Sequence, residues 1–509
     1  MADYAFQRYE RIVLNTQIQL ELLIQQGEAK PLLLWHALLP LVLPIIALLV
    51  PRRTWGWLLR PILSVTTLSV SLEIIRYRRV LLGANGYMIG LIMVWWLVWS
   101  MTLLVFNDVE RDFRRIVRTR STTVGDKTVR QNGHASNKEH KQSPVTRDTE
   151  TLVWKPYPQS LLPRLGWVIA LVLNMRGPDF SFRISSLDPL PPLLDPKHHS
   201  AIKKPACPSA TIRLRAAFLR FFIAYLAIDF LKLIIIWDPY FFGALSAPPP
   251  FPFDCFPAIP GLVSVYHSIV SGTAVYFALQ YVTSLNPIFF LGLSSAFPNA
   301  SRALTVTPLD APWLYADQFG PITAVLDDGL AGAWSKWWHQ IFRFGFVSTS
   351  KWLISLLPST LSSHRSIRRI IITLVAFGIS GLMHGSGSYT QIGETRPFSG
   401  TFLFFFLQPV GISIQGLCSR IIVTSLARHG LPPPRWLRRF GNVTFVLGWL
   451  LFTGNRIADD FANGKMWLTE PLPFSLLRGL MGRGWVCWRT PWFEHYDDGT
   501  FWGRGVRIL

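Results

Sequence analysis

Long apolar runs separated by polar stretches dominate the chain. A helix that crosses a bilayer needs about 20 mostly apolar residues, and eight apolar runs are candidates, two of which are short. These runs lie at residues 31–50, 61–75, 82–106, 216–237, 259–293, 370–389, 400–426 and 442–452. The pattern predicts an all-α fold, a polytopic transmembrane helical bundle with about eight spans.

Polar segments divide the chain around this bundle. Residues 1–30 mix charges with glutamines and lack the layout of a signal peptide, so we expect an N-terminal polar segment. Residues 107–158 contain eleven Lys or Arg, and residues 121–150 have almost no apolar side chain, which predicts a disordered cytoplasmic loop. The expected organisation is a transmembrane domain over residues 31–453, followed by a polar C-terminal tail at 454–509.

The composition agrees with a membrane protein. Half of the residues are hydrophobic and only 16% are charged, against about 25% in a soluble domain. The formal net charge is +21, and the basic residues gather in loops and beside apolar runs, as in cytoplasmic loops of membrane proteins. Neither a zinc-finger spacing nor an RNA-binding signature occurs. We therefore expect the lipid bilayer as a partner and no nucleic acid.

The sequence predicts neither a metal site nor a disulfide framework. Asp327 and Asp328 are adjacent acids without a third ligand in register, so a solvated loop is expected there. No two cysteines form a CxxC pair, which both kinds of site often use. The four cysteines are Cys207, Cys255, Cys418 and Cys487.

His384 is the most informative single residue. It follows Arg369 and an apolar run of 14 residues, 370–383, which as a helix covers about 21 Å of a hydrocarbon core about 30 Å thick. If Arg369 marks one interface, His384 lies well inside the membrane, where ionisable residues usually face a cavity or a partner. Ser380 and three glycines nearby predict room for a cavity. The alternatives are a helix that ends at Met383, with His384 as its cap near water, and ordinary packing by the small residues.

A second histidine lies in the aromatic segment 334–343. If this segment is helical, His339 and Arg343 share one face, and the forked guanidinium of Arg343 can bind a phosphate. The alternative is an aromatic belt at the membrane interface with a snorkelling arginine.

These two segments resemble the wax synthase-like branch of the membrane-bound O-acyltransferases. Residues 337–343 read WWHQIFR, similar to a WHQ-type motif, and residues 377–384 read FGISGLMH, similar to an SG-x-x-H motif. The two motifs occur in the family's order, about 45 residues apart. The Phe-rich run 404–408 is similar too, and residues 107–114 and 174–178 resemble fungal members, among them acetyltransferases that modify terpenoids and meroterpenoids.

The resemblance assigns roles only at matching positions. It implies that His384 is the catalytic histidine and that His339 takes part in catalysis. The other residues expected near the substrate or coenzyme A lie in the matched motifs: Trp338, Gln340, Arg343, Ser380 and Gln408. One departure is Gln415, since the branch often has an acidic residue after its Phe-rich run.

The resemblance implies an acyl-CoA-dependent O-acyltransferase, with acetyl-CoA as the favoured cosubstrate and no bound cofactor. A neutral imidazole would accept the proton of a hydroxyl that attacks the thioester, and His339, Gln340, Ser380 or Ser386 would stabilise the oxyanion. The expected acceptor is a hydrophobic alcohol such as a terpenoid or meroterpenoid intermediate of secondary metabolism. The expected location is the endoplasmic reticulum membrane.

Three other functions stay open at the level of sequence. The first is a long-chain acyl-CoA:alcohol acyltransferase of the wax ester type. The second is a membrane transporter that uses the same intramembrane histidine, which an inverted repeat would favour; no repeat is evident. The third is a non-catalytic membrane scaffold.

Overall fold

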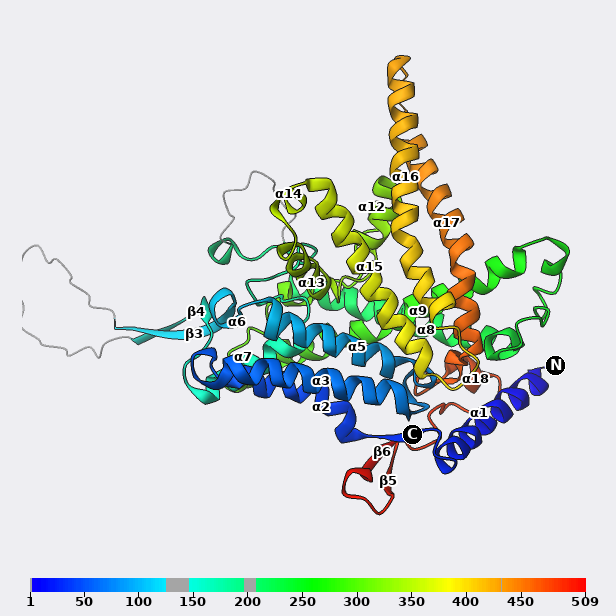
Figure 1. Cartoon of the computed structure of the whole chain (residues 1–509), viewed down its shortest axis with the longest axis horizontal. Coiled ribbons are helices and arrows are strands. Elements are labelled where there is room, and N and C mark those ends of the chain that lie inside the picture. Colours follow the sequence, from blue (N-terminus) through cyan, green and yellow to red (C-terminus); the bar gives the residue numbers. More distant parts are fainter. Residues whose placement is uncertain (1, 125–145, 196–206, 432) are drawn as a thin grey trace, which may run out of the picture.

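The computed structural model describes residues 2–124, 146–195, 207–431 and 433–509, and it is mostly helical (Figure 1). In chain order its α-helices are α1 (Ala2–Gln25), α2 (Leu34–Leu49), α3 (Trp57–Tyr77), α4 (Leu82–Asn85), α5 (Tyr87–Met101), α6 (Val109–Asp112), α7 (Leu161–Leu173), α8 (Ala210–Trp237), α9 (Leu262–Asn286), α10 (Gly292–Ala296), α11 (Pro298–Leu304), α12 (Thr323–Gly332), α13 (Arg343–Ser355), α14 (Ser359–Ser362), α15 (Arg365–Thr390), α16 (Leu403–Arg428), α17 (Arg435–Asn463) and α18 (Leu476–Leu480).

Five helical segments are long and apolar enough to cross a membrane. They are Arg52–Tyr77, Tyr87–Phe106, Leu262–Ala296, Arg365–Thr390 and Phe398–Arg428. Each contains one of the eight apolar runs or most of it, and the other three runs fall in α2, α8 and α17. The mostly helical fold is therefore confirmed, with five candidate membrane spans among the described residues, while the number of about eight spans stays a prediction.

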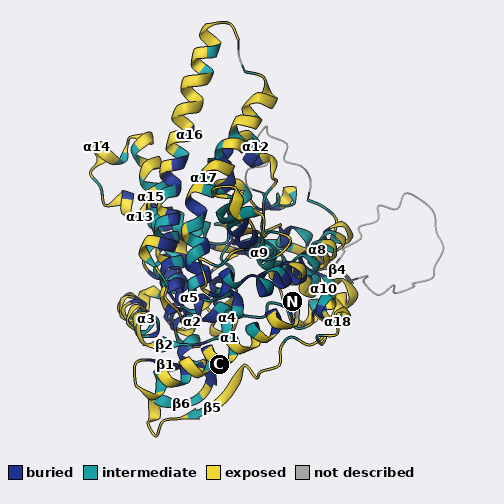
Figure 2. Cartoon of the chain, turned by 90° about the vertical axis from the view of Figure 1, so that its right-hand side faces the viewer, coloured by how far each residue is buried: buried dark blue, intermediate teal, exposed yellow. Residues whose placement is uncertain are grey.

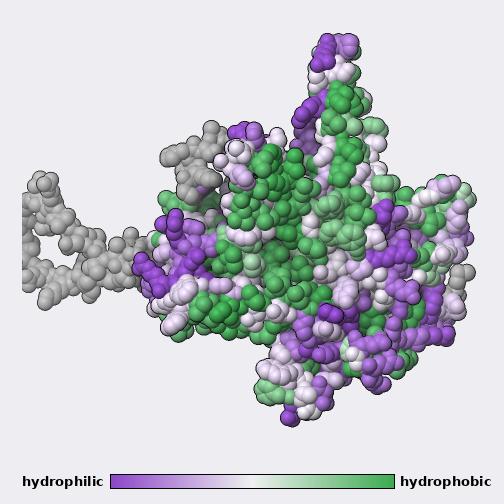
Figure 3. All heavy atoms as spheres, in the orientation of Figure 1, coloured by the Kyte–Doolittle hydropathy of each residue, from purple (hydrophilic) through white to green (hydrophobic). Residues whose placement is uncertain are grey.

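The surface has separate hydrophobic and hydrophilic regions, as a protein that contacts a bilayer requires. Hydrophobic residues cover the face formed by α13, α15 and α16, whereas hydrophilic residues gather at the outer end of the α16–α17 hairpin and around α1 and α18 (Figure 3). The buried residues concentrate where α5 and α15 pass each other, and the outer parts of α16 and α17 are exposed (Figure 2). Exposed apolar side chains on these helices suit contact with lipid.

The helices α5 and α15 approach very closely because glycines line their crossing. A Cβ added at Gly387 would lie 2.8 Å from the carbonyl oxygen of Tyr87, and one at Gly90 would overlap the carbonyl oxygen of Ser386. The Thr390 Oγ1 donates to the carbonyl of Gly86 at 2.9 Å and accepts from the amide of Gly90 at 3.1 Å. Small residues at helix crossings are the usual means of close packing in membranes, and here they bring the start of α5 to the end of α15.

Strands connect the two ends of the chain. The strands β1 (Lys30–Leu33), β2 (Arg78–Arg79), β5 (Phe493–Asp497) and β6 (Arg504–Ile508) form one sheet in the order β2-β1-β6-β5, with β1 and β6 antiparallel. The C-terminal residues expected to form a polar tail are therefore paired with the beginning of the chain. In addition α17 runs through residue 453, so no structural boundary separates the helical bundle from that tail.

The basic segment after α6 is not a disordered loop throughout. Residues Arg114–Val124 (β3) and Thr146–Pro156 (β4) form an antiparallel ladder, which contradicts the expectation of disorder at 121–124 and 146–150. Low hydrophobicity suggested disorder, but each strand contains three threonines, and β-branched residues favour strands. Residues 125–145 lie outside the described part of the chain.

Candidate active site

His384 lies in the interior of α15, which continues to Thr390. The alternative of a helix cap at Met383 is therefore wrong. The imidazole is partly buried, its ring stacks on Phe405 with centroids 4.3 Å apart and planes 14° from parallel, and its Nδ1 lies 2.7 Å from the Tyr87 Oη. The ring is thus held on one face and at one nitrogen.

The small residues around His384 serve packing more than they open a cavity. A Cβ at Gly381 would lie 2.8 Å from the ring of Phe402, and one at Gly385 would lie 3.1 Å from the carbonyl oxygen of Pro397. Ser380 lies one helical turn before His384 and is partly buried. The expected room near the ring is therefore largely filled by the segment before α16, because glycine allows the chains to touch there.

Tyr87 is the partner that the sequence analysis missed. It follows a run of four left-handed residues, with φ of 76° at Gly83, 63° at Ala84, 53° at Asn85 and 82° at Gly86. Left-handed backbone costs about 1 kcal/mol or more at each non-glycine residue, so neighbouring contacts must hold this turn. A cluster of two glycines and an asparagine directly before an aromatic run is the only sequence signal that could have indicated it.

The turn is tied to the end of α15. The Asn85 Nδ2 donates to the carbonyls of Gly464 at 2.7 Å and Ile392 at 3.1 Å. The Gln391 Nε2 donates to the carbonyl of Ala84 at 3.2 Å. Since Tyr87 begins the helix that follows, these bonds determine where its hydroxyl meets the imidazole.

A buried carboxylate lies near Tyr87. Asp460 is 1% exposed, and its carboxylate is close enough to the Tyr87 phenol for the two groups to interact electrostatically. It accepts hydrogen bonds from the Thr401 hydroxyl and from the amide of Arg396. The carboxylate is therefore held in place beside the phenol, and Phe461 packs edge-on against the Tyr87 ring at 5.3 Å.

The tautomer of His384 determines which of its nitrogens can act as a base, because the Tyr87 Oη can either donate to Nδ1 or accept from it. A neutral imidazole has one N–H and one lone pair. When Nδ1 donates to the Tyr87 Oη, the lone pair lies on Nε2, and that nitrogen can accept a proton from a substrate hydroxyl. The arrangement suits a general base.

His339 lies near His384, which a shared role of the two histidines in one site requires. The two imidazoles are within electrostatic range of each other. The His339 ring packs near Trp338 and Phe342, with centroids 5.4 and 5.6 Å away. Its Nδ1 is buried and has no hydrogen-bond partner among the residues that the structure describes.

The segment 334–343 is not one helix, so the condition under which His339 and Arg343 would share a helical face is not met. The turn η8 (Ala333–Trp337) ends at Trp338, whose ψ is 151°, and α13 begins at Arg343. His339 therefore lies in the irregular connection, and it does not share a helical face with Arg343. The aromatic run packs in several directions at once, and this tertiary packing overrides the helical spacing.

Gln340 and Arg343 hold this connection together. The Gln340 Nε2 donates to the carbonyls of Trp338 at 2.6 Å and Trp334 at 2.9 Å. The Arg343 guanidinium donates through one nitrogen to the carbonyl of Ser335 at 2.7 Å and to the Gln340 Oε1 at 2.9 Å. Their side chains support the loop that carries His339, and part of the expected phosphate-binding fork of Arg343 is already engaged.

Gln408 and Gln415 also have supporting positions. Gln408 is fully buried; its Oε1 accepts from the Trp334 indole at 3.2 Å, and its Nε2 donates to the carbonyl of Phe404 at 2.8 Å. The Gln415 Oε1 accepts from the amide of Leu330 at 2.8 Å. Gln415 thus joins α16 to α12, and its side chain makes no hydrogen bond to His384 among the described residues.

Among the described residues, no group of three or more His, Cys, Asp or Glu is placed to hold a metal ion.

Comparison with known proteins points to one family. The sequence pattern of the family described as Membrane bound O-acyl transferase family matches residues 315–407, which include both His339 and His384. No solved structure matches the chain.

Curated relatives match parts of the chain at low identity. The O-Mevalon transferase yanI of Aspergillus niger is 26% identical over 50% of this chain and 52% of its own length. The O-Mevalon transferase macI of Penicillium terrestre is 25% identical over 39% of this chain and 46% of its own length. The acetyltransferase aurG of Calcarisporium arbuscula is 28% identical over 35% and 39%. The matches span about half the length of these relatives or less.

Proposed function

We propose that this chain, whose residues 315–407 match the Membrane bound O-acyl transferase family, transfers an acyl group from a coenzyme A thioester to a hydroxyl, with His384 as the general base. The observation that carries the proposal is the hydrogen bond of 2.7 Å between Tyr87 and the Nδ1 of His384, with His339 close by. An oriented base beside a second polar group inside an apolar bundle is what acyl transfer needs.

The reaction balances with one histidine. The Nε2 of His384 accepts the hydroxyl proton while the alcohol oxygen attacks the thioester carbonyl carbon. The tetrahedral intermediate then collapses, its carbon–sulfur bond breaks, and the thiolate leaves with the proton from the imidazolium. The products are an ester and free coenzyme A, and no further reactant is required.

The oxyanion needs a hydrogen-bond donor, and we assign that role to His339. Its Nδ1 is buried without a partner among the described residues, and an N–H there would be free to bind the developing negative charge. Such donors are worth most in sites from which water is excluded. Gln340 then acts on the reaction indirectly, because its side chain holds the loop that carries His339.

The proposed substrates follow from the relatives and from the membrane. Relatives bear the names of acetyltransferases and O-mevalon transferases, which supports a small acyl group, and we favour acetyl. A hydrophobic alcohol of the terpenoid or meroterpenoid class would partition into the bilayer and reach the bundle from there. We expect the protein in the endoplasmic reticulum membrane, where the basic surface of a +21 chain would attract the polyanionic thioester.

The test uses membranes that contain the full chain. Labelled acetyl-CoA and palmitoyl-CoA are supplied separately with a panel of terpenoid alcohols, and ester formation is measured by mass spectrometry. We expect acetyl esters with the wild type and none above background with His384→Ala. The matched control is His364→Ala, which removes an exposed histidine just before the same helix. Ester formation by His384→Ala at the wild-type rate would refute the proposal, provided that both variants elute as folded protein.

A further inference from the structure

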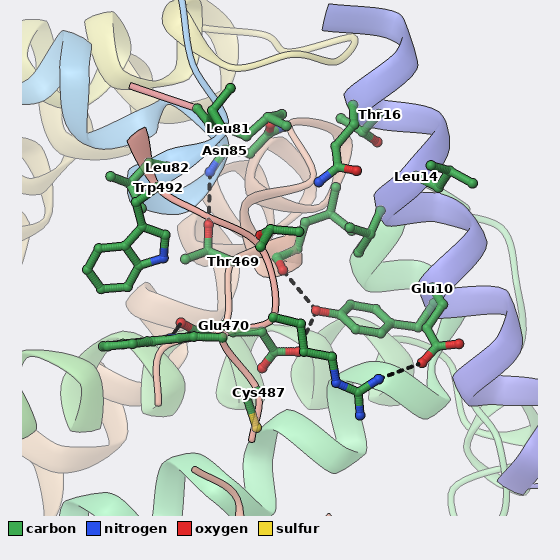
Figure 4. Close-up of a pocket in the computed structure, with 18 of the residues that line it drawn as sticks. Glu10, Leu14, Thr16, Leu81, Leu82, Asn85, Thr469, Glu470, Cys487 and Trp492 are labelled. Atoms are coloured by element: carbon green, nitrogen blue, oxygen red, sulfur yellow. Dashed lines mark hydrogen bonds and ion pairs between the residues drawn. The ribbon is translucent and has the colours of Figure 1, made fainter. Parts of the chain in front are cut away.

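Two large cavities lie apart from the two histidines. The first, of about 710 Å³, lies between α1 and residues 468–492, and Asn85 is in its wall (Figure 4). The second, of about 680 Å³, is a groove between α12, α16 and α17. Neither His339 nor His384 lines either cavity, so a molecule bound in one of them is not placed to react at His384.

The charged groups of the cavity beside α1 balance one another. Its wall contains three carboxylates and three guanidinium groups. Glu470 pairs with Arg478 at 2.8 Å, and Glu10 pairs with Arg489 at 3.6 Å. A balanced surface attracts neither cations nor anions strongly, so this cavity does not indicate the charge of a ligand.

The two carboxylates of the groove are neutralised by cations. Asp327 binds the guanidinium of Arg439 at 2.7 Å and that of Arg435 at 3.1 Å. Asp328 pairs with Lys336 at 2.7 Å. The carboxylates therefore leave the remaining cation of the groove without a counter-charge.

That remaining cation is Arg438. It lines the groove, is exposed, and forms no ion pair with any residue that the structure describes. It lies one turn after Arg435, near the start of α17 and hence at the outer end of the α16–α17 hairpin. A guanidinium is well suited to bind a phosphate group, so this end of the groove is suited to an anion.

The rest of the groove is mainly apolar. On α16 the lining extends from Ile412 to Leu426, which corresponds to about 21 Å of helix. The acyl chains of one leaflet occupy about 15 Å, half of a hydrocarbon core of about 30 Å, so an acyl chain and its headgroup fit this length. The apolar lining residues include Ile412, Ile422, Val423, Leu426, Leu437 and Phe445.

Glycines keep the groove open. Gly416 on α16 and Gly441 on α17 both line it, and a Cβ added at either would meet no heavy atom within 4 Å. At the crossing of α5 and α15, by contrast, a Cβ at Gly387 would lie 2.8 Å from a carbonyl oxygen. The glycines of the groove therefore border open space, which a ligand can occupy.

The direction of the groove matches a membrane surface. The helix α16 belongs to the candidate span Phe398–Arg428, and hydrophilic residues gather at the outer end of the hairpin beyond the hydrophobic face of the bundle (Figure 3). Leu417 and Ile421 on α16 are each 59% exposed, as helix positions in contact with lipid can be. Basic residues beside an apolar span are typical of the boundary with water. The Arg438 end of the groove therefore faces the headgroup layer.

We propose that this groove binds one anionic phospholipid of the bilayer, with its phosphate group at Arg438 and one acyl chain along α16 toward Phe445. Basic pockets between membrane helices bind anionic headgroups in this way. The inference does not depend on the acyltransferase function, because neither histidine lines the groove.

The test uses the full chain in phosphatidylcholine nanodiscs. Traces of phosphatidylglycerol or phosphatidylcholine with a diazirine in one acyl chain are added separately, and the crosslinked residues are mapped by mass spectrometry. We expect phosphatidylglycerol to label residues 412–426 and 437–445 more than phosphatidylcholine does. The excess should fall about fivefold in Arg438→Gln, the usual effect of one cation near a membrane surface. The matched control is Arg420→Gln, which removes an exposed arginine of α16 that does not line the groove.

A second variant fills the groove without changing its charge. Gly441→Leu should lower labelling by phosphatidylglycerol about tenfold, as added bulk in apolar pockets commonly does. Its control is Gly448→Leu on the same helix, where a Cβ also meets no heavy atom within 4 Å and which does not line the groove. Melting temperatures in detergent identify any variant that is poorly folded, and the exposed Arg438→Gln then decides.

Three results would overturn the proposal. Equal labelling by the two lipids would show that the groove has no preference for an anion. Equal losses in Arg438→Gln and Arg420→Gln would show a general attraction of the basic surface. Displacement of the phosphatidylglycerol probe by soluble glycerol phosphate would show that the site binds a free phosphate and not a lipid.

Discussion

The rings of His384 and His339 lie near each other and are held in different ways. Tyr87 binds the Nδ1 of His384 at 2.7 Å, and Phe405 stacks on its face at 4.3 Å. His339 lies in an irregular loop, touches aromatic rings, and keeps a buried Nδ1 without a partner among the described residues. A base must be oriented before the reaction, whereas an oxyanion donor must stay free until charge develops. The difference between the two surroundings therefore fits the two roles that we propose, His384 as the base and His339 as the oxyanion donor.

The largest expected effect comes from His384→Ala. General-base catalysis contributes about 10²–10⁴-fold, so kcat should fall by about 10³-fold or more. Added imidazole should restore part of the rate, because the missing group is a proton acceptor. The measurement is ester formation at saturating substrates. A variant that keeps more than half of the wild-type kcat would remove His384 from the mechanism.

His339→Ala should lower kcat by about 10²-fold, the usual cost of one oxyanion donor. His339→Asn should recover much of this loss, since its amide supplies an N–H and lacks a basic nitrogen. The pair of variants distinguishes a donor from a second base, which asparagine could not replace. Equal losses in both variants would contradict the donor role.

The glycine crossing of α5 and α15 is tested by Gly387→Ala, whose Cβ would lie 2.8 Å from the carbonyl oxygen of Tyr87. The two helices must then separate, at a cost of about 2 kcal/mol, and Tyr87 moves away from His384. We expect a lower melting temperature in detergent together with a lower kcat. The control is Gly378→Ala in the same helix, where a Cβ meets no atom within 4 Å. An equal response of the two variants would show that the crossing is not tight.

The smallest effect is expected from Tyr87→Phe. This change removes the hydroxyl bonded to Nδ1 and keeps the ring against Phe461. A hydrogen bond is worth about 1 kcal/mol, so kcat should fall about five- to tenfold with little change in KM or melting temperature. If kcat and melting temperature fell together, Tyr87 would support the fold and not the base.

The difference between the two histidine sites also marks where sequence interpretation ended. The order and spacing of residues 337–343 and 377–384 predicted one site for both histidines, and in the structure the two imidazoles are close enough to interact electrostatically. The sequence left open whether residues 334–343 form one helix, and the structure shows that the segment breaks at Trp338. Tyr87 was missed, since it lies 297 residues before His384 in the chain.

The sequence by itself determined that this protein is a helical membrane bundle and that His384 belongs inside it. Transfer of an apolar run into lipid depends on the residues of that run alone, so length and hydrophobicity can be read locally. Only the tertiary structure decided that the Tyr87 hydroxyl bonds the Nδ1 of His384, that β6 joins the C-terminus to β1, and that Asn85 lines a cavity. Those features arise from contacts between distant segments, and such contacts exist only once glycines and turns have set how closely the helices pack.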